Sequence, residues 1–198
     1  MTVTLDFAPA IFTAAADQIR NARLRRELNV REIAAPARIA PHAVALGAGI
    51  NRTGFGEIGG HSDIDSAAGA GRLILLHDPE MVDEWGSDFR FVCYAQAPLE
   101  LEIITDPFIA DVAWSWLMDA LHSRGAEFTA VGGTATTTLS TGYGALAGSE
   151  KGAQVQLRAS WTPGDEDFEK HAQAWSELLC LLSGLPHEEG VASFNAHR

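Results

Sequence analysis

Apolar residues recur every three to four positions in three separate stretches, which is the pattern of helices with one buried side. These stretches predict helices over about residues 7–27, 106–124 and 165–183. The middle helix has the clearest ends, because Asp106 can cap its first turn and Gly125 suits the left-handed closing position. The apolar stripe predicted to face the core in this helix comprises Ile109, Val112, Ala113, Trp116, Leu117, Ala120 and Leu121.

Runs rich in apolar and β-branched residues fill the stretches between the helices and predict strands. Six such runs cover residues 30–35, 43–50, 72–77, 89–96, 127–139 and 153–161. Residues 99–104 also alternate like a strand, but the prolines beside them leave that segment open. Within the fifth run, Gly132 and Gly133 predict a bulge or a close approach of two backbones.

The order of elements is helix, three or four strands, helix, two strands, helix. Because the strands come in groups, the pattern predicts a single α+β domain with a mostly antiparallel sheet of five or six strands and three main helices. We expect this domain to span residues 1–186 and residues 187–198 to form a loosely ordered tail. Residues 51–71 are rich in glycine, small polar residues and acids, and are expected to form a flexible loop.

Composition and charge narrow the classes of partner. The 198 residues are 46% hydrophobic and 20% charged, which is ordinary usage for a folded domain. A net charge of −12 argues against nucleic acid and anionic membranes, because both attract surplus Lys and Arg. No membrane-spanning or export segment is recognisable, so a cytoplasmic location is expected. Cys93 and Cys180 stand in apolar surroundings and are expected to be reduced core thiols.

The charge is unevenly spread along the chain. Residues 1–38 hold six arginines and four acids, a net of +2, so the remainder carries −14. The cluster of Arg20, Arg23 and Arg26 has two interpretations. These side chains can pair with the acidic remainder of the same chain, or they can form a docking face for an acidic partner.

The loop at 51–71 contains two motifs that resemble nucleotide sites. Residues 54–59 spell GxGxxG, but no helix follows to hold a pyrophosphate, so we interpret this stretch as a glycine loop. Asp63 and Asp65 have the Asp-x-Asp spacing of nucleotidyltransferases, in which two carboxylates on one strand grip magnesium. No apolar strand continues after Asp65, however, which favours a solvated acidic loop.

Two further candidates for chemistry remain open. Glu100 or Glu102 could supply the third carboxylate of a transferase site, and His61 could join Asp63 and Asp65 around a weakly held cation. His77 has two interpretations, as a strand-end histidine bonded to the Asp78 turn or as a general base oriented by Asp78.

No other motif indicates catalysis. The sequence has no HExxH, no GxSxG and no phosphate-binding loop ending in Gly-Lys. It therefore predicts no cofactor and no resident metal.

Five segments in the second part of the chain together resemble a known family. They are GRLILLHDP (71–79), VAWSWLMDAL (112–121), AVGGT (130–134), RASWTP (158–163) and AWSELLCLLSGLP (174–186). In this order they are similar to the actinobacterial family catalogued as domain of unknown function 3000, from the first helix to Pro186. The resemblance implies a cytoplasmic bacterial protein of this size, and it carries no known activity or catalytic residue.

Three hypotheses of function follow. The first is a non-enzymatic binding or adaptor protein that pairs with a protein partner or with a second copy of itself. Its element order is similar to that of type III secretion chaperones, which is an analogy of fold alone. The second is a metal-dependent nucleotidyl or phosphoryl transferase using Asp63 and Asp65. The third is a small-molecule binder with a pocket lined by Trp114, Trp161 and the Gly132–Thr134 strand.

Overall fold

The computed structural model describes residues 8–51, 68–147 and 152–188. Its strands form one antiparallel sheet in the order β1-β2-β3-β4-β6-β5. The strands are β1 Leu28–Ile33, β2 His42–Ile50, β3 Ala70–His77, β4 Phe89–Pro98, β5 Phe128–Ser140 and β6 Gly152–Pro163. The helices are α1 Ala10–Arg20, α2 Val82–Trp85, α3 Ile109–Ser123 and α4 Phe168–Leu182, with short 3-10 turns at Pro79–Met81 and Gly144–Leu146. The predicted single α+β domain with an antiparallel sheet is confirmed.

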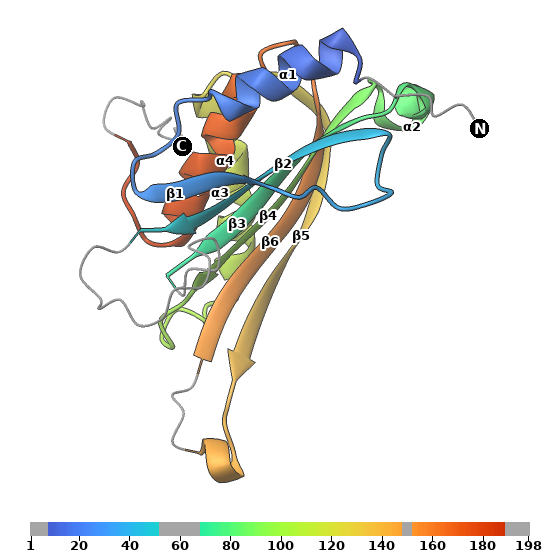
Figure 1. Ribbon diagram of the computed structural model, residues 1–198. Coiled ribbons are helices and arrows are strands. Elements are labelled where there is room, and N and C mark those ends of the chain that lie inside the picture. Colours follow the sequence, from blue (N-terminus) through green and yellow to red (C-terminus); the bar gives the residue numbers. More distant parts are fainter. Residues whose placement is uncertain (1–7, 52–67, 148–151, 189–198) are drawn as a thin grey trace.

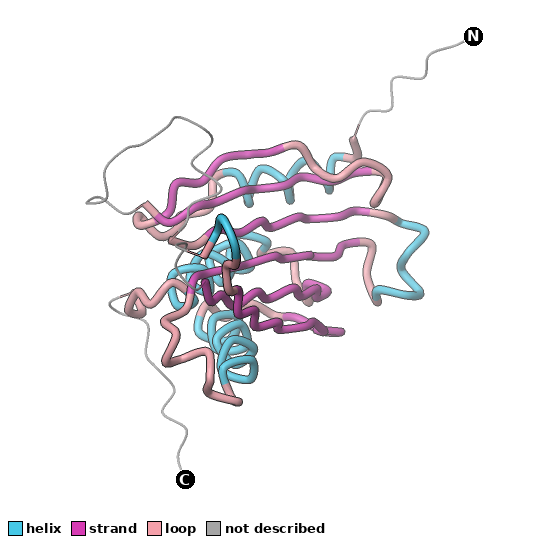
Figure 2. Tube along the Cα trace, turned by 90° about the horizontal axis from the view of Figure 1, so that it is seen from below, coloured by secondary structure: helices cyan, strands magenta, loops and turns pink. Residues whose placement is uncertain are grey.

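The three longer helices cover one face of the sheet. Helix α1 lies against β2, α4 against β3 and β4, and α3 against β5 and β6 (Figure 1). Figure 2 shows the same sheet from below, with its strands side by side. Within the described residues, no helix is long and apolar enough to cross a membrane.

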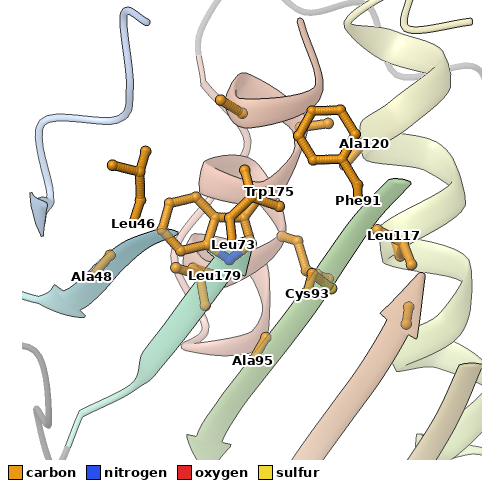
Figure 3. Packing of buried hydrophobic residues seen from close by; sticks show 14 of the residues in the cluster. Leu46, Ala48, Leu73, Phe91, Cys93, Ala95, Leu117, Ala120, Trp175 and Leu179 are labelled. Atoms are coloured by element: carbon orange, nitrogen blue, oxygen red, sulfur yellow. The ribbon is translucent and has the colours of Figure 1, made fainter. Parts of the chain in front are cut away.

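The core fills the space between the sheet and these helices. Strand β4 alternates strictly, with Phe91, Cys93 and Ala95 buried and the residues between them half-buried. These side chains meet Trp175 and Leu179 of α4 and Leu117 of α3 (Figure 3). Because alternate side chains of a strand point to opposite faces, this pattern leaves the other set of β4 residues on the uncovered face.

The predicted stripe of α3 does face the core, but the first helix is shorter than predicted. Helix α1 ends at Arg20 instead of near residue 27. The Asn21 side-chain amide donates to the Asp17 carbonyl at 2.8 Å and closes the last turn. The residues that follow leave the helix, and the buried Arg25 lies among them. Arg25 pairs there with Glu177 of α4, a long-range contact that helix periodicity does not show.

Two other local predictions are refined by the structure. Residues 99–104 form a turn after β4, not a strand. In β5 the bulge lies just before the predicted glycine pair, between Thr129 and Gly132, where Ala130 has φ 47°. Gly133 itself marks the close approach, because a Cβ there would meet the Arg158 carbonyl oxygen and lie 2.9 Å from the Trp114 ring.

Candidate functional site

The residues proposed for a transferase site are not brought together in the part of the chain that the structure describes. Asp63, Asp65 and His61 lie outside the described residues, so that hypothesis stays a prediction. Glu100 and Glu102, named as possible third carboxylates, lie in the turn after β4 and not on a strand. Across residues 8–51, 68–147 and 152–188, no three His, Cys, Asp or Glu side chains form a group that could hold a metal ion.

The arginines of the proposed docking face divide into two kinds. The Arg20 guanidinium donates to both Glu32 carboxylate oxygens, at 2.9 and 3.0 Å, and to Asp17 at 3.1 Å. Arg23 and Arg26 are exposed near the end of α1. The intramolecular interpretation therefore holds for Arg20, and the docking interpretation stays a prediction for the other two.

Neither cysteine is placed for nucleophilic chemistry. Cys93 and Cys180 are free thiols and both are buried. Burial raises the pKa of each thiol to about 12, so both stay protonated at neutral pH. This confirms the prediction that the two cysteines are reduced core residues.

His77 is buried at the end of β3 and contacts a different acid from the one predicted. Its Nε2 lies 3.2 Å from the carboxylate of Asp88, whereas the prediction names Asp78 as the partner. The Asp78 carboxylate instead accepts the Glu80 backbone N–H at 3.0 Å and caps the following turn. Aromatic rings surround His77, with the Phe89 ring centroid at 4.7 Å. This enclosed position fits a packing role better than a general base that must reach substrate.

The predicted tryptophan pocket is not formed as expected. Trp161 has no exposed surface and stacks on Phe91, with ring centroids 5.5 Å apart, on the side of the helices. Trp114 packs on the same side against Gly133. The Gly132–Thr134 segment, by contrast, lines a groove on the opposite face of the sheet. Of the three parts of the predicted pocket, only the Gly132–Thr134 strand lines a groove. Trp114 and Trp161 do not.

This groove, called here the open-face groove, has a volume of about 920 Å³. It crosses four neighbouring strands in the order β3, β4, β6 and β5, and Pro36 of the β1–β2 connection forms part of its wall. Its described lining residues are Pro36, Ala70, Gly71, Arg72, Ile74, Val92, Cys93, Tyr94, Gln96, Gly132, Gly133, Thr134, Arg158, Ala159 and Ser160. The volume falls within the range of ~300–1,000 Å³ that is typical of small-molecule sites.

The described lining of the open-face groove differs in its charged residues from the protein as a whole. None of its described lining residues is an aspartate or a glutamate, and two of them are arginines. The whole chain carries 26 acidic residues against 14 basic ones. Arg158 is therefore a positive group in a described lining that holds no acid, on a strongly negative protein.

A chain of hydrogen bonds holds Arg158 in place on the floor of the groove. Its Nε donates to the Gln156 side-chain oxygen at 3.1 Å, and the Gln156 amide donates to the Tyr94 hydroxyl at 2.8 Å. The Tyr94 hydroxyl in turn donates to Gln96 at 2.7 Å. The Arg158 guanidinium carbon also lies 5.6 Å from the centre of the Tyr94 ring. These contacts use only Nε, so both terminal nitrogens of Arg158 remain available as a two-pronged donor.

Arg90 of β4 orients the Ser160 hydroxyl beside Arg158. Its two terminal nitrogens donate to the hydroxyls of Ser160 and Thr162, each at 2.8 Å, and no acidic side chain among the described residues pairs with it. Burial lowers the pKa of Arg90, as expected for a charge that is partly removed from water without a counter-ion. Because the Ser160 oxygen accepts from Arg90, its own proton is free to point toward a ligand in the groove.

The residues of this groove are visible in the sequence only as two alternating patterns. In β4 the outward positions are Arg90, Val92, Tyr94 and Gln96, and in β6 they are Gln154, Gln156, Arg158 and Ser160. Alternation predicts that each set shares a face. It does not predict that β4 and β6 are neighbours, because a helix and another strand separate them along the chain. The sequence pattern therefore shows the two outward-facing sets of residues but not the groove that they form together.

Comparison with known proteins identifies the family and nothing more specific. No curated protein and no solved structure matches the chain. Residues 8–192 match the family model described as Protein of unknown function (DUF3000). Since this match covers almost the whole chain, the resemblance seen in its five segments is confirmed, and the chain belongs to the domain of unknown function 3000 family.

Proposed function

We propose that this protein is a binding protein, not an enzyme, and that its open-face groove holds a small ligand carrying a carboxylate or phosphate group. The observation that carries the proposal is the absence of acids from the described groove lining in a chain with net charge −12. The terminal guanidinium nitrogens of Arg158 and the Ser160 hydroxyl would bind the carboxylate or phosphate group of the ligand. As alternate residues of a strand, Arg158 and Ser160 have Cα atoms roughly 6.6 Å apart and side chains on the same face.

The size of the ligand follows from the range of the electrostatic forces. A small anion inside the groove interacts mainly with the nearest arginines, because salt screens charges beyond about 10 Å. A polyanion such as nucleic acid would extend past the groove and meet the negative remainder of the surface. The charge distribution therefore favours a small anionic molecule over a nucleic acid.

The rest of the ligand is expected to be apolar or planar. Ile74, Val92 and Tyr94 supply half-buried apolar surface beside the arginines. Sites of this kind combine an apolar lining with a few well-placed polar groups that orient the ligand. No general base is positioned beside the Ser160 hydroxyl among the groove's described lining residues, which supports binding over catalysis.

The R158Q variant tests this function directly. Removing the guanidinium eliminates two charge-assisted hydrogen bonds to the anion, each worth about 1.5–3 kcal/mol, so affinity should fall about a hundredfold or more. Binding is measured by calorimetry against a panel of small carboxylates and phosphate monoesters, first screened for thermal stabilisation of the wild-type protein. The S160A variant should weaken binding by a smaller factor.

The matched control is R23Q. It makes the same change in net charge at an exposed position, beside the end of α1 and next to Glu169 of α4. Its affinity should equal that of the wild type. A wild-type protein that binds no member of the panel, or an equal loss in R23Q and R158Q, would contradict the proposed site.

A further inference from the structure

The two edges of the sheet are built differently. Strand β1 forms one edge, is only six residues long, and carries the exposed charges Arg31 and Glu32. Glu32 is also bound by Arg20 of α1. A short, charged edge strand held by a neighbouring helix is a common protection against pairing with another chain. The β1 edge is therefore closed to further strands.

Strand β5 forms the other edge and has none of these protections. It is 13 residues long, and eleven of its positions from Phe128 to Ser140 are Thr, Ser, Ala, Gly or Val. The sequence holds no charged residue between Glu127 and Glu150, although 20% of the whole chain is charged. Its threonines at 134, 136 and 137 are exposed. Such an edge presents a row of unpaired backbone donors and acceptors.

The end of the β5–β6 hairpin adds exposed apolar surface. Figure 1 shows the ends of β5 and β6 projecting beyond the other strands, with a short 3-10 turn near the tip. Leu139, Tyr143 and Leu146 in this region are 57%, 80% and 64% exposed. Three large apolar side chains this exposed on one projecting tip are a sign of a contact surface.

We propose that β5 pairs with β5 of a second copy of this chain, in antiparallel orientation, and joins the two sheets into one. Two copies that each carry net charge −12 repel each other over most of their surface. The charge-free β5 edge is the part of the described sheet where they can approach without that cost. The threonine-rich strand also pairs well with itself, because Thr–Thr contacts across strands are favourable.

The same geometry explains why assembly stops at two copies. Antiparallel pairing of identical strands forms a closed interface with twofold symmetry. The remaining free edges are then the two protected β1 strands, which do not support further growth.

In a pairing centred on Thr134, Leu139 of one copy lies opposite Thr129 of the other. The tip with Tyr143 and Leu146 then reaches the turn between α3 and β5 of the second copy. There the rings of His122 and Phe128 lie side by side, with centroids 5.3 Å apart, and form an aromatic surface.

The T136K variant tests this interface by its oligomeric state. Sedimentation velocity over a concentration series should show the wild type with twice the mass of the 21.2 kDa chain. A lysine at this exposed edge position should shift T136K to the monomer, with an unchanged circular dichroism spectrum. The matched control is N29K on the β1 edge, which should remain a dimer.

Disulfide trapping provides an independent readout. Under mild oxidation, T134C should form a covalent dimer, because the twofold axis places this residue opposite itself, whereas T138C should not. The natural cysteines are buried and do not compete. A wild type that is monomeric throughout the series overturns the proposal. A dimer that survives T136K and gives no disulfide at either position also overturns it, since the contact then lies elsewhere.

Discussion

Replacing Glu177 with glutamine is expected to lower the free energy of unfolding by about 3 kcal/mol, because breaking a buried ion pair leaves an uncompensated charge. The Glu177 side chain has no exposed surface. One of its oxygens accepts from Arg25 and from Arg124, each at 2.9 Å. In E177Q these arginines keep only their more exposed partners, Glu27 and Glu188, and face a neutral amide at the buried position. Urea unfolding of the variant and the wild type at pH 7 measures the difference.

The position of Glu177 explains why the effect should be large. This one carboxylate joins the segment after α1, the end of α3 and the middle of α4, through Arg25, Arg124 and its own helix. Burial by itself would raise the pKa of Glu177, but the hydrogen bonds and charges of these arginines outweigh it and keep the pKa below its usual range. The ionised form is thus the stable one in the folded protein.

The matched control is E32Q. Glu32 also makes two hydrogen bonds to an arginine, Arg20, but both side chains are well exposed. Exposed ion pairs contribute about 0–1 kcal/mol, so E32Q should cost less than about 1 kcal/mol. Equal costs for E32Q and E177Q would show that burial of the Glu177 pair is not what makes it important.

The second large effect concerns His171 and should appear as a loss of about 3 kcal/mol of stability between pH 7 and pH 4. His171 is fully buried on α4, and its Nδ1 accepts a hydrogen bond from the Trp161 indole at 3.0 Å. Protonation would place a second N–H where the indole already donates. Burial lowers the pKa of His171 to about 4, although Asp165 and Asp167 act in the opposite direction and Lys170 adds to the lowering.

The direction of the pH effect follows from the two states of this group. In the unfolded chain a histidine has a pKa near ~6.5 and takes up its proton as the pH falls through that value. The folded protein takes it up only near pH 4. Between these values the unfolded state binds more protons, so stability decreases as the pH falls. Each unit of difference is worth ~1.36 kcal/mol, which gives the expected loss.

The H171Q variant separates this effect from other acid-sensitive groups. Glutamine keeps an oxygen that can accept from Trp161, but it does not titrate. Between pH 7 and pH 4.5 the free energy of unfolding of H171Q should therefore fall less than that of the wild type. The control is H122Q, at an exposed position of α3, which should keep the full pH dependence of the wild type. If H171Q loses as much stability as the wild type over this interval, His171 is not the responsible group.

Local patterns in the sequence were sufficient for most of the fold. Grouped strands indicated an antiparallel α+β sheet, and Ile109 to Leu121 indicated the buried side of α3, because both depend on periodicity within one element. The same alternation placed Arg158 and Ser160 on one side of β6. The cysteines were also assigned correctly, since apolar neighbours on both sides indicate burial in the core.

Only the tertiary structure determined which of these surfaces meet. The order β4-β6-β5 brings residues more than 60 positions apart, such as Tyr94 and Gln156, into one hydrogen-bonded groove. The buried pair of Arg25 and Glu177 spans 152 positions, and it involves a segment outside α1, which ends at Arg20, earlier than its periodicity predicts. Local sequence fixes which way a side chain points relative to its own backbone. Neighbouring strands, long-range charge pairs and the uncovered face arise from packing between distant segments, where no local pattern carries the information.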